Sequence, residues 1–221
     1  MSKDPVQAML RTIDRHAATV QAVLGRDHVD PRVMAAIARV PRARFVPEAD
    51  RHLAHGDHPL PIGHGQTISQ PFIVAFMTDL LGLQPDHRVL EIGTGCGYQA
   101  AVLAELAREV DTIELVPELA AQARAVLVEL GYRNVRVHDG DGRLGLEASA
   151  PFDRIIVTAA PERVPETLTR QLAPNGRLVI PVGGGPGQQA LLVIDKDEKG
   201  RLTERRTIGV AFVPLLAGSP L

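Results

Sequence analysis

The sequence contains few aromatic residues, one cysteine and no large excess of either charge. Tryptophan is absent and aromatic residues make up 3% of the 221 positions, so a core must be built from Val, Leu, Ile and Ala. A single cysteine excludes an internal disulfide framework and fits a reducing compartment. The net charge of −2, with both signs spread along the chain, leaves no basic stripe for binding nucleic acid.

Long apolar runs are also missing. No stretch reaches the roughly 20 apolar residues of a transmembrane helix, and the N-terminus lacks the apolar segment of a signal peptide. We therefore expect a cytoplasmic protein with neither a membrane nor a nucleic-acid partner. Nothing in the pattern indicates an obligate interface, so a monomer is the default expectation. With 45% apolar residues, residues 1–221 are expected to form one domain.

One stretch, residues 88–99, organises the rest of the chain. The apolar run 89–92 predicts a strand buried on both faces of a parallel sheet. Three alternating glycines follow, and then a helix-forming, alanine-rich run. Such a turn aims backbone N–H groups at a ligand, and the missing Cβ atoms allow the ligand to approach closely. Tyr98 stands where the dinucleotide fingerprint G-x-G-x-x-G needs its last glycine, which argues against a pyrophosphate.

Two acidic residues indicate the kind of ligand. Glu91 lies just before the glycines, where a carboxylate suits a cationic group better than a phosphate. Glu114 ends the next strand-like run, about twenty residues later, where an acid can accept hydrogen bonds from ribose hydroxyls. Together they favour S-adenosylmethionine, whose amino-acid end and sulfonium carry positive charge. The alternative is that the glycine loop is only a tight turn between a strand and a helix.

Strands alternate with helices from residue 89 onward, which predicts a doubly wound, Rossmann-like α/β sheet. The sheet is expected to be mostly parallel with an antiparallel C-terminal pair, preceded by N-terminal helices. The predicted strands are 89–92, 110–114, 135–137, 154–158, 177–182, 190–195 and 207–213. The predicted helices are 6–24, 31–38, 72–81, 99–106, 117–130 and 165–172.

The segments 40–47 and 57–71 interrupt this pattern. They are too rich in Pro and Gly for regular structure, and we expect an ordered, functional loop. The domain would then consist of helices and this active-site loop in residues 1–82 and a cofactor-binding sheet in residues 83–221. Ligands of such sheets bind over the carboxyl ends of the strands, where Glu91, Glu114, Asp141 and Thr158 are expected.

With these pieces in place, the sequence resembles the protein-L-isoaspartate O-methyltransferases over nearly its whole length. The glycine loop is shared with most S-adenosylmethionine enzymes, whereas the run from Gln66 to Pro71 is much more specific. The shared segments are 40–42, 45–47, 60–63, 65–71, 89–95, 140–142, 151–153, 156–160 and 212–215.

The resemblance implies a role for each matching residue. Ser69 would be the active-site serine, and Gln66, Thr67 and Ile68 would wall the site beside the methyl donor. Glu91, Gly93 and Gly95 would hold the cofactor's amino-acid end, Glu114 its ribose, and Asp141 with Gly142 its adenine. Val213 and Pro214 would lie beside the bound peptide. Cys96 and Ala211 depart from the family pattern, and Ala211 leaves the peptide preference open.

The implied reaction transfers a methyl group from S-adenosylmethionine to the free α-carboxylate of an L-isoaspartyl residue in a damaged protein. The products are a methyl ester, which leads to repair through a succinimide, and S-adenosylhomocysteine. The partners would be isoaspartyl-containing proteins and peptides. That carboxylate is ionised at neutral pH, so no general base is needed and positioning and desolvation dominate.

Several alternatives stay open at this point. A relative that methylates a normal Asp in one dedicated peptide partner would share the architecture, and a non-catalytic S-adenosylmethionine-binding module is a third class. Ser69 as a hydrolase nucleophile is disfavoured because G-x-S-x-G is absent, although Ser69 can also be a helix N-cap. The spacing of His52, His55 and His58 invites a metal reading, but no cysteine or carboxylate completes a site, and no metal is expected. Cys96 lies near a helix start that can lower its pKa, but packing is its expected role.

Overall fold

A seven-stranded sheet forms the centre of the computed structural model, which describes residues 4–185 and 187–218. The strand order is β5-β4-β3-β6-β7-β8-β9. The pairs that β3 forms with β4 and β6 are parallel, whereas β8 is antiparallel to both β7 and β9. The strands are β3 (Arg88–Ile92), β4 (Glu109–Glu114), β5 (Val135–Asp139), β6 (Phe152–Val157), β7 (Leu172–Val182), β8 (Gln189–Lys196) and β9 (Leu202–Val210). The predicted sheet, mostly parallel with an antiparallel C-terminal end, is confirmed.

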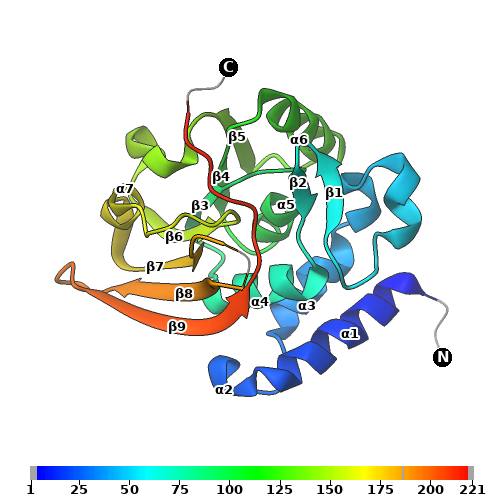
Figure 1. Ribbon diagram of the computed structural model, residues 1–221, viewed down its shortest axis with the longest axis horizontal. Coiled ribbons are helices and arrows are strands. Elements are labelled where there is room, and N and C mark those ends of the chain that lie inside the picture. Colours follow the sequence, from blue (N-terminus) through cyan, green and yellow to red (C-terminus); the bar gives the residue numbers. More distant parts are fainter. Residues whose placement is uncertain (1–3, 186, 219–221) are drawn as a thin grey trace.

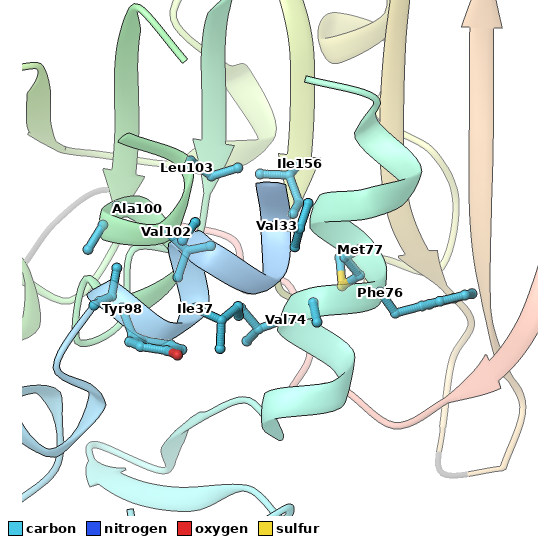
Figure 2. Packing of buried hydrophobic residues seen from close by; sticks show 14 of the residues in the cluster. Val33, Ile37, Val74, Phe76, Met77, Tyr98, Ala100, Val102, Leu103 and Ile156 are labelled. Atoms are coloured by element: carbon cyan, nitrogen blue, oxygen red, sulfur yellow. The ribbon is translucent and has the colours of Figure 1, made fainter. Parts of the chain in front are cut away.

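Most helices cover one face of this sheet (Figure 1). Residues of α3, α4 and α5 pack together with apolar residues of β3, β4 and β6. The labelled side chains of Figure 2 show part of this packing, with Ile156 of β6 beside residues of the three helices. The helices on this side are α1 (Pro5–Thr19), α2 (Gln21–Leu24), α3 (Pro31–Arg39), α4 (Pro71–Leu81), α5 (Tyr98–Ala104) and α6 (Pro117–Glu129). None of the helices in the described part of the chain is long and apolar enough to cross a membrane.

Fewer helical residues pack on the opposite face of the sheet. Leu168 of α7 (Glu166–Arg170) packs against a second apolar cluster that contains Leu90 and Ile155. Two short 3-10 helices, η3 (Gly142–Leu144) and η4 (Glu147–Ser149), follow β5. Because both faces are covered, β3 and β6 are almost completely buried, as expected of parallel strands.

The Pro- and Gly-rich segments contain regular structure, which corrects the expectation of a loop. Residues 40–54 hold two 3-10 helices, η1 (Arg42–Phe45) and η2 (Glu48–Leu53). A hairpin of β1 (Leu60–Gly63) and β2 (Gln66–Ile68) follows. Its two-residue turn places His64 at φ 52° and Gly65 at φ 70°, and two positive φ values suit the twist of such hairpins. One of the glycines that argued against regular structure, Gly65, therefore forms part of the turn.

Further boundaries differ from the sequence expectations, including that of the last strand, which was expected at 207–213 and is β9 (Leu202–Val210). The first helix ends at Thr19, and α2 begins after Val20, whose φ of −116° and ψ of 21° break the helical run. Residues 174–176, which precede the predicted strand 177–182, lie inside β7, where the register with β6 shifts and Asn175 has φ 60°. The break at Val20 and the shift in β7 are local distortions within elements that the sequence pattern located.

Asp57 connects this hairpin region to the start of α4. Its Oδ1 accepts a hydrogen bond from the backbone N of Phe72 at 2.9 Å, and its Oδ2 accepts one from Gln70 Nε2 at 2.7 Å. The same Oδ2 lies 2.7 Å from Nδ1 of His16 on α1. Asp57 thus satisfies a free N–H at the first turn of α4 and fixes the residues on either side of Pro71.

We predict that Asp57→Ala lowers the free energy of unfolding by about 2–3 kcal/mol, because hydrogen bonds to a buried charged group are lost. Chemical denaturation measures this change. Asp27→Ala is the matched control, since Asp27 is 73% exposed where it pairs with His28, and its loss should change stability little. Equal effects of the two substitutions would contradict the role given to Asp57.

Candidate active site

The glycine loop after β3 is held from both sides. Thr158, at the end of β6, donates its hydroxyl to the carbonyl O of Gly93 at 2.6 Å. A Cβ at Gly93 would lie 2.5 Å from that hydroxyl oxygen, and the φ of Gly93 is 93°. Only glycine fits both the contact and the backbone conformation. This loop borders a cavity over the carboxyl ends of β3, β4 and β6, which is called the cofactor cavity below.

Glu114, the last residue of β4, holds the other side of the loop. Its Oε2 accepts a hydrogen bond from Gly95 N at 2.7 Å, and its Oε1 accepts one from Val116 N at 3.0 Å. The side chain lines the cofactor cavity. Each carboxylate oxygen retains a lone pair for a ligand, which is the geometry expected for contacts to two ribose hydroxyls.

Glu91 lies beneath the loop. It is completely buried and is not among the described residues that line the cofactor cavity. Its Oε2 accepts a hydrogen bond from the Thr112 hydroxyl at 2.6 Å, and the hydroxyls of Thr112 and Thr94 are 2.7 Å apart. Burial raises the pKa of Glu91 to about 8. In this structure the side chain therefore supports the loop from below, and its contact with the amino-acid end of a cofactor stays a prediction.

Asp141 and Gly142 follow β5 at the same edge. Asp141 caps η3 by accepting a hydrogen bond from Arg143 N at 2.9 Å, and its carboxylate lies 2.6 Å from Arg143 Nη2. This pairing lowers the pKa of Asp141. Gly142 lines the cofactor cavity, and a Cβ there would lie 2.3 Å from Ile92 Cγ2. The cavity floor thus requires a glycine at this position.

Ser69 lines two adjoining hollows beside the cofactor cavity. A passage lined by Ser69, Gly95 and Tyr98 leads from the glycine loop. A wider hollow, the acceptor groove, is lined by Ser69 and by Pro59, Gln70, Ile73, Gln189, Phe212 and Val213. Thr67 and Thr158 line both of these hollows and the cofactor cavity. Ser69 therefore lies between the passage along the glycine loop and the acceptor groove.

The C-terminal segment forms the wall between the cofactor cavity and the acceptor groove. Its main chain pairs with Ala160, whose N donates to Val213 O at 2.8 Å, while Leu215 N donates to Ala160 O at 2.9 Å. The Gln189 carboxamide bonds both the N and the O of Phe212, at 2.6 and 3.0 Å. Figure 1 shows this red segment crossing the front of the sheet from β9.

The cofactor cavity fits the ligand that the sequence indicates. Glu114 is the one charged side chain among the described residues that line it, so the cavity offers no cation for a phosphate. Apolar side chains, among them Ile113, Val116 and Pro214, supply surface for an aromatic base. A nucleoside that carries positive charge matches both properties.

Comparison with known proteins identifies the family. The family model described as protein-L-isoaspartate(D-aspartate) O-methyltransferase matches residues 16–219. The chain belongs to this family.

Relatives of the methyltransferase family span nearly the whole chain. A protein-L-isoaspartate O-methyltransferase of Syntrophobacter fumaroxidans is 52% identical over 95% of this chain and 85% of its own. One from Anaeromyxobacter is 58% identical over 86% and 90%.

Solved structures agree in fold. A protein-L-isoaspartate O-methyltransferase aligns with a TM-score of 0.78 at 27% identity, covering 93% of this chain and 66% of that longer chain. The crystal structure of a Plasmodium falciparum protein with the same family name, in complex with S-adenosyl-L-homocysteine, aligns with a TM-score of 0.79 at 24% identity, covering 97% of this chain and 99% of that one.

The methyltransferase fold brings most of the predicted site residues together. Those that line one or more of the three hollows are Gln66, Thr67, Ile68, Ser69, Gly93, Gly95, Glu114, Gly142, Val213 and Pro214. Glu91 and Asp141 lie behind this surface. Thr158 was assigned no ligand contact from the sequence, although its position at a strand end was the available signal. The contacts of Gln189 left no local signal, because they depend on the folded path of the C-terminal segment.

Cys96 has a different environment from the one its sequence position suggested. Burial raises the pKa of its thiol to about 11, so the proximity of a helix start does not make it acidic. Packing, its expected role, fits this environment.

We predict that Glu91 makes stability depend on pH. Its pKa is about 8 in the folded cofactor-free protein, against 4.5 as the ordinary value. The folded state therefore binds more protons between these pH values, and stability falls as pH rises from about 5 to 8, by on the order of a few kcal/mol. Glu91→Gln should flatten this slope in thermal melts, whereas the exposed Glu118→Gln should retain it. Parallel curves for the wild-type protein and Glu91→Gln would contradict the prediction.

Proposed function

We propose that residues 1–221 act as one S-adenosylmethionine-dependent carboxyl methyltransferase domain, with Ser69 at the acceptor site. Its acceptor is the free α-carboxylate of L-isoaspartyl residues in damaged proteins and peptides, and the resulting methyl ester leads to repair through a succinimide. The position of Ser69 supports this proposal, because the residue lines both the acceptor groove and the passage along the glycine loop. We keep the monomeric state and the cytoplasmic location as predictions.

Different residues in and beside the cofactor cavity contact different parts of the ligand. Glu114 accepts hydrogen bonds from the ribose hydroxyls, and Gly142 with Asp141 borders the adenine. The loop of Gly93 and Gly95 lies against the amino-acid end, with Glu91 beneath it. When bound, S-adenosylmethionine supplies a methyl group on a positively charged sulfur. The absence of a cationic side chain among the described lining residues supports this assignment.

The acceptor carboxylate needs orientation more than activation. An α-carboxyl has an ordinary pKa of about 3.3–3.7, so it is ionised at neutral pH and no residue has to remove a proton. The Ser69 hydroxyl donates a hydrogen bond to one carboxylate oxygen and leaves the other facing the methyl group. Thr67 and Ile68 exclude water beside it. Alignment and desolvation then supply the rate enhancement.

The acceptor groove suits a flexible peptide of varied sequence. Its described lining residues are apolar or neutral, among them Pro59, Ile73, Gln70 and Phe212. These lining residues include no charged side chain that would select a particular residue next to the acceptor in the peptide. This supports an acceptor that is recognised by its isoaspartyl linkage and not by the flanking sequence. A dedicated protein partner and a non-catalytic binding module are the alternatives that an experiment must separate.

One assay separates these three functions. The protein is incubated with S-adenosylmethionine labelled in its methyl group and with two peptides that differ only in Asp or isoAsp at one position. We expect base-labile label on the isoAsp peptide alone. Label on the Asp peptide would contradict the proposed acceptor, and label on neither peptide, with S-adenosylmethionine bound, would favour a binding module.

We predict that Ser69→Ala lowers kcat by about 10²-fold or more and changes the Kd for S-adenosylhomocysteine by less than about threefold, because the hydroxyl acts on the acceptor. Steady-state kinetics and calorimetry measure the two quantities. Ser149→Ala, at a half-buried serine of η4, is the matched control and should change neither. Equal losses in kcat and in affinity for the cofactor would instead assign Ser69 to the cofactor-binding site.

A further inference from the structure

Arg42 is a completely buried cation behind the active-site serine. It begins η1, and its side chain is among the largest that are fully buried in the described part of the chain. Its Nη2 donates to the carbonyl O of Ser69 at 2.8 Å, and its Nε donates to the carbonyl O of Ala54 at 2.8 Å. One guanidinium thus joins the end of η2 to the residue between β2 and α4.

The same guanidinium also contacts the cofactor side of the site. Its Cζ lies 4.7 Å from the ring centroid of Tyr98, the first residue of α5 after the glycine loop. Phe45 of η1 packs edge-on against that ring at 5.6 Å. Tyr98 and Ser69 line the same passage between the cofactor cavity and the acceptor groove. Arg42 therefore contacts both the main chain of the serine and the residue that follows the glycine loop.

The charge of Arg42 has no close counter-ion among the described residues. Its guanidinium donates to two main-chain carbonyls and lies over the Tyr98 ring, and it forms no ion pair with a described residue. Asp57 acts on it only from a longer distance, and Asp57 is already engaged by Gln70, Phe72 N and His16. Burial accordingly lowers the pKa of Arg42, although a guanidinium stays protonated at neutral pH.

Packing alone does not explain this arrangement. A buried cation without a carboxylate partner is unfavourable, and a neutral side chain of similar volume would fill the space at a lower cost in free energy. The anion that completes the site is the acceptor carboxylate, which under the proposed function binds at Ser69. The guanidinium, which binds the carbonyl O of Ser69, attracts that carboxylate without forming an ion pair with it. The carboxylate therefore keeps its reactivity as the nucleophile.

We propose that Arg42 is a positioning residue for the acceptor carboxylate. Arg42 holds the main chain of Ser69 and supplies positive electrostatic potential behind this serine. The proposal rests on the proposed function, because it requires an anionic acceptor at Ser69. Two properties of the guanidinium are separable by substitution. Lysine keeps the charge and loses the forked geometry, whereas methionine loses both and keeps much of the volume.

The test compares two peptides in the full-length protein. One carries the isoaspartyl α-carboxylate, and the other carries a neutral α-carboxamide at the same position, measured as a competitive inhibitor. In the wild-type protein the carboxylate peptide binds better. Arg42→Met should reduce the ratio of the two affinities by about tenfold or more, because a nearby unpaired charge contributes at least that factor in a partly desolvated site. Arg42→Lys should retain most of the ratio while kcat falls.

Arg154→Met provides the matched control. Arg154 is a partly buried arginine that, like Arg42, donates to a main-chain carbonyl, Leu81 O at 2.7 Å. It lies where the pairing of β6 with β3 begins, and it does not line the cofactor cavity. Arg154→Met should lower the melting temperature and leave the affinity ratio unchanged. If Arg42→Met does not fold, Arg42→Lys decides the question, since wild-type kcat in that variant would overturn the positioning role.

The outcomes distinguish this proposal from the proposed function. An unchanged affinity ratio in Arg42→Met, with a lower melting temperature alone, would make Arg42 purely structural and leave the methyltransferase function intact. A tenfold weaker Kd for S-adenosylhomocysteine would place its effect on the cofactor and also overturn the proposal. Absence of label on the isoaspartyl peptide in the wild-type protein would instead contradict the function itself.

Discussion

The whole site depends on the hydrogen bonds that hold the glycine loop after β3 between the ends of two neighbouring strands. Glu114 of β4 binds the loop through Gly95 N, and Thr158 after β6 binds it through Gly93 O. Both contacts require backbone that no Cβ obstructs. The parallel sheet supplies this arrangement, because β3 pairs directly with β4 and β6 and their carboxyl ends lie side by side.

The acceptor side is built differently, from short elements fastened by single polar side chains. Asp57 holds the start of α4 and Arg42 holds Ser69, while Gln189 holds the segment that carries Val213. These three residues give a loop-rich region one fixed geometry beside the rigid sheet. Methyl transfer to a weak nucleophile demands such geometry, since alignment is most of what the protein supplies.

The sequence located the elements of the sheet and most of the surface of the site. The apolar runs, the alternation of strands with helices and the glycine spacing are local signals. They predicted the strands, and they placed helix starts at or next to Pro31, Pro71 and Pro117, as observed. The hairpin at Gly65 was missed because Pro and Gly were read as breaking structure, whereas a two-residue turn requires positive φ. The burial of Glu91 and the contacts of Arg42 depend on residues distant in sequence, which one sequence does not reveal.

The most direct test of the account is a crystal structure of the protein with S-adenosylhomocysteine and an isoaspartyl peptide. The account predicts the ribose hydroxyls on Glu114 and the peptide's free α-carboxylate within hydrogen-bond distance of the Ser69 hydroxyl, pointing toward the cofactor sulfur. A carboxylate bound elsewhere, or a nucleoside that leaves Glu114 uncontacted, would contradict it.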